Sequence, residues 1–155
     1  MLRIALIGAG SAKERVKTLK YSYMLENVYL YDPLPKNLIP KVLAAADGGI
    51  ILHGVSRLYR ETAMPNKFFD YIAAGLPVIF NFEGPLRDQI LTHQAGFYVD
   101  YRKPEELSKT LVMLFENPEI GLKAGLRARR MAEEYFDQEK MAEKFVMTLA
   151  EVVTA

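Results

Sequence analysis

The chain has 155 residues, half of them apolar, and 20 basic residues against 19 acidic ones give it a net charge of +1. Such a length suits one compact domain, and the balanced charge argues against a nucleic-acid-binding protein that relies on bulk positive charge. The absence of cysteine excludes a disulfide framework and a thiolate metal site, and we expect no metal site. No apolar run reaches the ~18 residues of a membrane span, and the N-terminus does not resemble a signal peptide, so we expect a cytoplasmic protein.

Short apolar runs alternate with amphipathic stretches along the first two thirds of the sequence. The runs are typical of buried parallel strands and the stretches of helices. The predicted strands cover residues 2–8, 27–31, 48–54, 77–81 and 96–100. The predicted helices cover residues 11–24, 38–47, 66–74, 84–94, 103–117, 118–136 and 138–153. The polar segment 55–65 is predicted to be a loop.

This order of elements predicts an α/β fold: a Rossmann-like parallel sheet with flanking helices and a helical C-terminal end. We expect residues 1–155 to form a single domain. Open parallel sheets bind ligands at the carboxyl ends of their strands. The candidate binding loops are therefore those that follow residues 8, 31, 53 and 81.

The stretch PNKFFDYIAAGLPVIF, residues 65–80, combines a helix start with two charged residues. Asn66 is predicted to cap a short helix, or Pro65 to be its first residue, and the helix places Lys67, Asp70 and Tyr71 on one face. Backbone N–H groups at a helix N-terminus suit a phosphate, and the acidic side chain one turn along suits sugar hydroxyls. The pattern alone leaves open a plain salt bridge between Lys67 and Asp70, worth a few tenths of a kcal/mol.

The same stretch resembles the donor-binding signature P-x-K-x-(F/L)-(E/D)-Y-(M/I/L)-A-A-G-x-P-V of retaining GT-B glycosyltransferases of the group 1 family, GT4. LRIALIGAG (2–10), ENVYLYDPLPKNLIPKVLAAADGGIIL (26–52) and AGFYVDYRKPEELSKTLVMLFENPE (95–119) resemble further segments of that family, in the same order. The resemblance covers almost all of residues 2–150. It implies the C-terminal, nucleotide-sugar-binding domain of a GT-B enzyme.

The resemblance implies a sugar transfer from a UDP- or GDP-sugar without an obligatory cofactor. The acceptor would be a carbohydrate, lipid-linked, bound by a separate N-terminal domain. The implied setting is the synthesis of bacterial surface polysaccharide such as O-antigen or capsule, in the cytoplasm or peripherally at the inner membrane face.

Roles at the helix of residues 66–74 follow from the same resemblance. Asp70 would hold the ribose hydroxyls, while backbone groups around Met64, Asn66 and Lys67 would meet the diphosphate. In many relatives a glutamate eight residues before this carboxylate contacts the donor sugar. Thr62 stands there in this sequence, and the neighbouring Glu61 would replace the glutamate only after a shift of the loop.

The resemblance also assigns residues at three other strand ends. The loop around Leu34 and Pro35 would pack on the base. His53 and Gly54 would line the cleft, and the glycine-rich turn at Gly10 would face it.

The family's C-terminal domain begins one strand and one helix earlier, with a segment whose Arg and Lys stabilise the leaving diphosphate. We therefore expect a fragment that is inactive alone, and a partner chain, such as a second copy, is one way to cover the missing strand.

Two other functions stay open at this point. The turn GAGSAK (8–13) has Lys13 where a dinucleotide-binding fingerprint has its third glycine, and Asp32 lies near the place of the ribose-binding acid of an NAD(P)-binding Rossmann domain. The third possibility is a non-catalytic α/β interaction module. Affinity for nucleotides separates the three.

Overall fold

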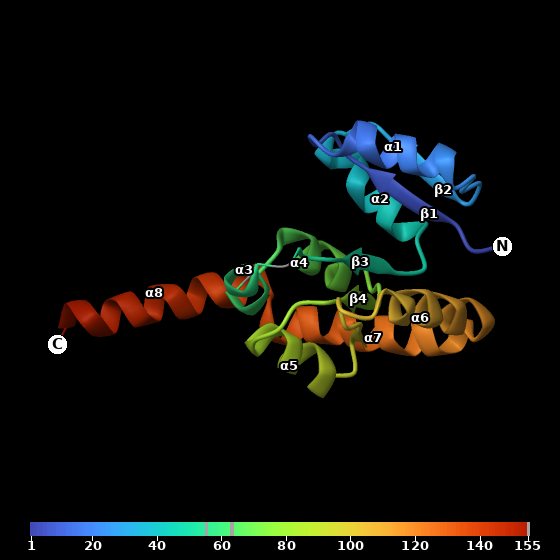
Figure 1. Ribbon diagram of the computed structural model, residues 1–155. Helices are drawn as coiled ribbons and strands as arrows, with labels where there is room; N and C mark the ends of the chain where they lie inside the picture. Colours follow the sequence, from blue (N-terminus) through green and yellow to red (C-terminus); the bar gives the residue numbers. More distant parts are fainter. Residues whose placement is uncertain (55, 63, 155) are drawn as a thin grey trace. The chain divides into compact units, whose positions relative to one another are not determined.

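A computed structural model describes residues 1–54, 56–62 and 64–154 of the protein (Figure 1). The chain divides into two compact units, unit 1 over Met1–Ala45 and unit 2 from Ala46 onward. Each unit has a parallel sheet with helices, and the C-terminal end is helical. The predicted fold class is therefore confirmed, whereas the single domain over residues 1–155 stays a prediction.

Unit 1 is a small strand–helix–strand arrangement. Its strands are β1 (Ile4–Ile7) and β2 (Val28–Tyr31), which pair in parallel from Ile4 opposite Val28 to Ile7 opposite Tyr31. Its helices are α1 (Lys13–Ser22), the 3-10 helix η1 (Lys36–Leu38) and α2 (Ile39–Ala44). The apolar runs near residues 2–8 and 27–31 thus form the strands that the sequence predicts.

Unit 2 contains a three-stranded parallel sheet in the order β3-β4-β5. The strands are β3 (Gly49–Ile51), β4 (Val78–Phe80) and β5 (Gly96–Tyr98). The helices are α3 (Arg57–Thr62), α4 (Asn66–Ala73), α5 (Pro85–Thr92), α6 (Pro104–Glu116), α7 (Pro118–Tyr135) and α8 (Gln138–Thr154). The sequence missed α3, because its polar residues carry no apolar period.

The core of unit 2 forms where α4 packs on the sheet and on α7. Every residue of β4 is buried, as expected for a central parallel strand. Phe68 and Ile72, one turn apart on α4, are completely buried beneath it. Burial of a side chain of this size stabilises a fold by about 1.5–3 kcal/mol, so this cluster fixes the position of α4.

The C-terminal end of α4 also has a defined geometry. Gly75 has φ +71°, and the N–H of Leu76 donates to the carbonyl of Tyr71, the pattern of a Schellman motif. The guanidinium of Arg129 on α7 donates to the carbonyl of Ala73. The turn predicted at Gly75 is confirmed, and it directs the chain into β4.

Helix α8 carries an apolar stripe that is exposed to solvent. Met141, Phe145, Leu149 and Val152 share this stripe, and each is at least 49% exposed. Within the described ranges, no helix combines the length and the apolar character that a membrane crossing requires.

Candidate functional site

The carboxyl edge of the three-stranded sheet gathers most of the predicted site residues. Its parallel strands end at Ile51, Phe80 and Tyr98, and the chain continues from them into polar segments. Because β3 and β4 are parallel, the helical connection between them must run back across the sheet. This places the N-terminus of α4 at the same edge as His53 and Gly54, which follow β3.

Helix α4 begins at Asn66, and Pro65 is its N-cap residue in an extended conformation. The sequence predicted either Asn66 as the cap or Pro65 as the first helical residue, and both are wrong by one residue: no side chain caps this helix, and the carbonyl of Pro65 accepts the N–H of Phe68 at 2.9 Å. At a helix start, the N–H groups that precede this first bond have no acceptor one turn earlier in the helix. The helix start is therefore suited to an anion, and Met64, 57% exposed, precedes it.

Lys67 lies in this first turn, within the range at which its charge acts on His53. Partial burial, together with the positive charge of Lys67, lowers the pKa of His53 below its ordinary value of 6.5. The imidazole is therefore neutral at pH 7, with one ring nitrogen as a donor and the other as an acceptor. The ring of His53 also contacts that of Phe82, with centroids 5.7 Å apart.

Asp70 is exposed one turn further along α4. Among the residues that the structure describes, Lys67 and Asp70 form no ion pair with each other. The simple salt bridge that the sequence left open is therefore absent from the described part. Both charged groups face solvent at the edge of the sheet.

Tyr71 was expected beside Lys67 and Asp70, but its ring packs against the core of unit 2. A methyl group added at Gly49 would lie 2.1 Å from this ring, so the strand and the ring need the glycine. Burial, with a smaller contribution from the charge of Asp70, raises the pKa of Tyr71. The hydroxyl-bearing ring behaves as a core residue here.

Glu61 and Thr62, the two candidates for a sugar contact, lie at the end of α3. The Thr62 hydroxyl donates to the carbonyl of Leu58 at 2.8 Å, as a helical Thr commonly does. Glu61 lines a shallow groove of about 600 Å³. The other residues of this groove come from the segments after β4 and β5: Glu83, Gly84, Pro85, Tyr101 and Arg102.

These groove residues were missed by sequence reasoning. The sequence marks the segment after residue 81 as a candidate loop, but it gives no pattern that joins it to residues 101 and 102. In the structure, the Arg102 guanidinium forms three hydrogen bonds to the Asp100 carboxylate and its backbone N–H a fourth, and they lower the pKa of Asp100 to about 2. Burial and a hydrogen bond to Glu83 raise the pKa of Tyr98 to about 12.

The remaining predicted residues, Gly10, Leu34 and Pro35, belong to unit 1. They follow β1 and β2, at the carboxyl edge of the two-stranded sheet. The carbonyl of Gly10 accepts the N–H of Lys13, whose ammonium group pairs with Asp32. The acid that an NAD-binding site would need thus has a lysine partner.

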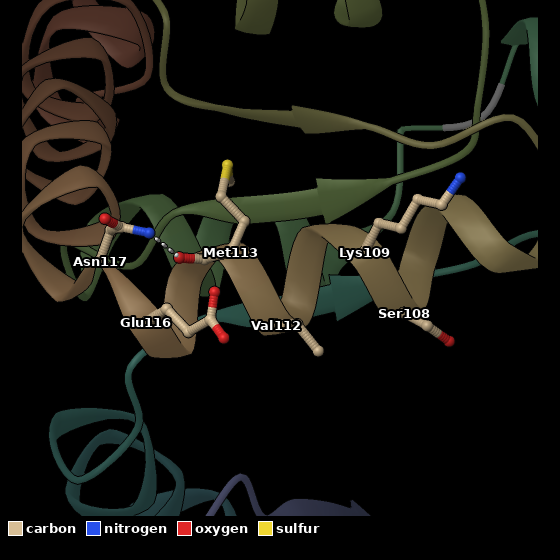
Figure 2. A pocket seen from close by; sticks show the side chains of 6 residues that line it. All are labelled: Ser108, Lys109, Val112, Met113, Glu116 and Asn117. Atoms are coloured by element: carbon tan, nitrogen blue, oxygen red, sulfur yellow. Dashed lines mark hydrogen bonds between the residues drawn. The ribbon is translucent and has the colours of Figure 1, made fainter.

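A second depression, of about 380 Å³, lies along α6 and contains none of the predicted site residues (Figure 2). Its lining comes from Ser108, Lys109, Val112, Met113, Glu116 and Asn117. The Asn117 amide donates to the carbonyl of Met113 at 3.0 Å and closes the last turn of α6. The depression is a feature of one helix surface, and no strand end reaches it.

A model of the family described as Glycosyl transferases group 1 matches residues 1–133. The chain belongs to this family. A curated relative, an uncharacterized glycosyltransferase from Haemophilus influenzae, is 24% identical over 137 residues, which are 85% of this chain and 36% of the relative. The predicted family is therefore confirmed.

Solved structures show the same fold as this group 1 family chain. The UDP complex of HepE from Anabaena matches 97% of this chain with a TM-score of 0.76 at 17% identity. A sucrose-phosphate synthase from Thermosynechococcus elongatus matches 98% with a TM-score of 0.80 at 17% identity. The predicted GT-B type of fold is thus confirmed, while the narrower GT4 assignment stays a prediction.

The chain spans only part of these relatives. It covers 36% of the curated glycosyltransferase, 41% of HepE and 39% of the sucrose-phosphate synthase. These relatives therefore contain long segments that this chain does not match.

Proposed function

We propose that this chain binds the nucleoside-diphosphate part of a UDP- or GDP-sugar, as the donor-binding domain of a retaining glycosyltransferase. The observation that carries the proposal is the arrangement at the start of α4. Lys67 lies in the first turn of α4 at the same sheet edge as His53, and Asp70 is exposed one turn later without an ion pair to Lys67 in the described part of the chain. A cationic helix start followed by a carboxylate matches the order of groups in a diphosphate joined to a ribose.

Each group of this arrangement has a chemical part in the proposal. The first turn of α4, with Lys67, holds the negative charge that grows on the diphosphate as the bond to the sugar breaks. The Asp70 carboxylate accepts hydrogen bonds from the ribose hydroxyls. The sugar then bonds to an acceptor oxygen, whose proton is released. His53, Gly54, Met64, Asn66, Glu61 and Thr62 would surround the donor.

The comparisons support this class of ligand without assigning any residue of the chain. HepE has been crystallised with UDP and also with UDP-glucose. At 17–18% identity that likeness concerns the fold, so the roles proposed here rest on the geometry of this chain. From the resemblance to the family alone, we also propose that the loop around Leu34 and Pro35 packs on the base and that the turn at Gly10 faces the ligand.

Further parts of the proposal concern the longer enzyme. We propose a lipid-linked carbohydrate acceptor held by a separate domain, with a setting in bacterial surface polysaccharide synthesis at the cytoplasmic face of the inner membrane. The isolated chain would bind the donor without transferring its sugar, and two copies would associate as a dimer.

A thermal-shift titration tests the proposed function. UDP, GDP and NAD are added to the wild-type chain, to Asp70→Ala and to Asp47→Ala, which removes an equally exposed acid near the amino end of β3. A ligand at 100 times its dissociation constant adds about 2.7 kcal/mol of stability. We expect UDP or GDP to stabilise the wild type and Asp47→Ala, and to stabilise Asp70→Ala much less.

Two results would contradict the proposal. Stabilisation by NAD alone would favour a dehydrogenase-like site. An equal response of Asp70→Ala and the wild type would remove the ribose-binding role of Asp70.

A further inference from the structure

Asn81 is a buried polar residue directly after β4, and nothing in its sequence context marks it. It is 4% exposed. Its side-chain amide makes two hydrogen bonds, both to the backbone of one residue: the N–H of His53 donates to Asn81 Oδ1 at 2.7 Å, and Asn81 Nδ2 donates to the carbonyl of His53 at 2.9 Å. A buried amide with both polar atoms satisfied by one partner defines the position of that partner closely.

The two bonds extend the sheet beyond its last backbone pair. Strand β3 pairs with β4 up to Ile51 opposite Phe80, and His53 lies two residues further. A side-chain amide presents an N–H donor and a carbonyl acceptor in one plane, as a pair of peptide groups does along a strand. The Asn81 side chain therefore pairs with the His53 backbone as one more residue of β4 would. These two hydrogen bonds hold His53 beyond the point where the backbone pairing of β3 and β4 ends.

His53 follows β3 at the edge of the sheet where α4 begins. Its ring contacts Phe82, and its proximity to Lys67 is seen in the effect of that charge on the imidazole. A shift of the His53 backbone would thus move the ring relative to the start of α4. The Asn81 amide connects the end of the sheet to the place where the diphosphate is proposed to bind.

We propose that Asn81 is a positioning residue that fixes His53 at the ligand edge beside Lys67, a role that rests on the proposed function of that edge. Asn81 touches no ligand in this account and acts only through the His53 backbone. Its removal should loosen His53 and weaken nucleoside-diphosphate binding while unit 2 stays folded.

Two variants separate the parts of this role. Asn81→Leu keeps the branched shape of the side chain, with two larger methyl groups, and removes both hydrogen bonds. Asn81→Asp keeps the acceptor for the His53 N–H but loses the donor and puts a carboxylate against the His53 carbonyl. Because Asn81→Leu removes the Asn81 partners of two His53 backbone groups, Asn81→Asp serves as the second variant if that chain does not fold.

Asn117→Ala is the matched control. Asn117 is a half-buried Asn whose side-chain amide bonds to a backbone carbonyl, that of Met113, but it lies at the end of α6 away from the sheet edge (Figure 2). The Asn117→Ala substitution should lower the melting temperature without changing nucleotide affinity. His93, the second of the two histidines, provides an internal reference for the signals of His53.

The experiment measures amide hydrogen exchange of His53 by NMR and the affinity for UDP and GDP by calorimetry, on the full chain. In Asn81→Leu and Asn81→Asp we expect faster exchange at His53, unchanged His93 ring signals, and affinity reduced by about tenfold, the loss that corresponds to 1.4 kcal/mol. An unchanged exchange rate at His53 would show that the Asn81 hydrogen bonds do not hold the His53 backbone. Faster exchange with unaltered affinity, or an equal loss of affinity in Asn117→Ala, would overturn the positioning role.

Failure of the proposed function gives a different result. A wild-type chain that binds neither UDP nor GDP would contradict that function, while the exchange of His53 would still decide whether Asn81 holds it.

Discussion

The two units of this chain are built from the same pattern and differ in what they bury. Each has parallel strands connected by helices, with polar segments at the carboxyl ends. In unit 2, β4 is buried along its whole length and Phe68 of α4 is completely covered. In unit 1 no residue is buried, and Leu6 of β1 remains 44% exposed. Alternation of strand and helix therefore predicts the elements but not the core, and the core of the chain lies in unit 2.

The largest expected difference between the units is the cost of removing an apolar side chain. Phe80→Ala should lower the free energy of unfolding by about 3–5 kcal/mol, as is typical of a fully buried Phe. Leu6→Ala should cost less than about 1 kcal/mol, because the side chain already contacts water. Urea denaturation of both variants checks this. Equal losses would show that the contrast between the two units is wrong.

A substitution at Gly84 should have the next largest effect. Gly84 has φ +84°, and an added methyl group would lie 2.2 Å from the carbonyl oxygen of Glu61. A left-handed conformation costs about 1–2 kcal/mol for a residue with a side chain, and the segment must also move away from α3. Gly84→Ala should therefore lower the melting temperature clearly. Gly48→Ala, where a methyl group meets only ordinary contacts, is the control.

Acid should weaken the end of β5 through Asp100. Hydrogen bonds from Arg102 lower the pKa of Asp100 to about 2 in the folded chain, from an ordinary value of 3.8. The stability from this group is complete above pH 3.8 and is lost as the pH falls toward 2, because protonation removes the pairing with Arg102. The melting temperature of Asp100→Asn should thus depend less on pH in this range than that of the wild type.

The control for this acid effect is Asp47→Asn, an exposed acid of the same unit. It should follow the wild-type curve. Identical curves for Asp100→Asn and the wild type would contradict the assignment of acid sensitivity to the pair of Asp100 and Arg102.

The smallest expected effect lies in unit 1. Lys13 pairs with Asp32, whose side chain is 88% exposed, and such surface pairs contribute little. Asp32→Asn should leave the melting temperature nearly unchanged at low salt and wholly unchanged at high salt, where screening removes the interaction. A change in melting temperature as large as that expected for Asp100→Asn would contradict the ranking of these two ion pairs. Unaltered UDP or GDP affinity is also expected, because Asp32 has no role in the proposed site.

Sequence periodicity predicted most elements of the fold because burial on one face leaves a repeat that can be read. Asp70, Lys67 and His53 were expected near one edge, since parallel strands force α4 to begin there. Helix α3 has no apolar period, so it was predicted as a loop. The sequence placed Tyr71 on the polar face because of its hydroxyl group and its helical spacing from Lys67 and Asp70. In the structure, its aromatic ring packs on Gly49.

Contacts made by single side chains left no pattern to read. Asn81 is a single polar residue after an apolar strand. Its two hydrogen bonds to the His53 backbone can be recognised only when the register of β3 and β4 is known. The same holds for the groove around Arg102, which joins the ends of two strands and α3. These are long-range pairings, and they depend on tertiary structure more than on local propensity.

The most direct test of the central claim is hydrogen exchange of the chain with and without saturating UDP or GDP, read by mass spectrometry. The account predicts slower exchange at residues 64–72, around the start of α4, and at residues 52–54 after β3, with no change along α6. Protection confined to α6, or none anywhere while a nucleotide is bound, would contradict the placement of the donor site at the carboxyl edge of unit 2.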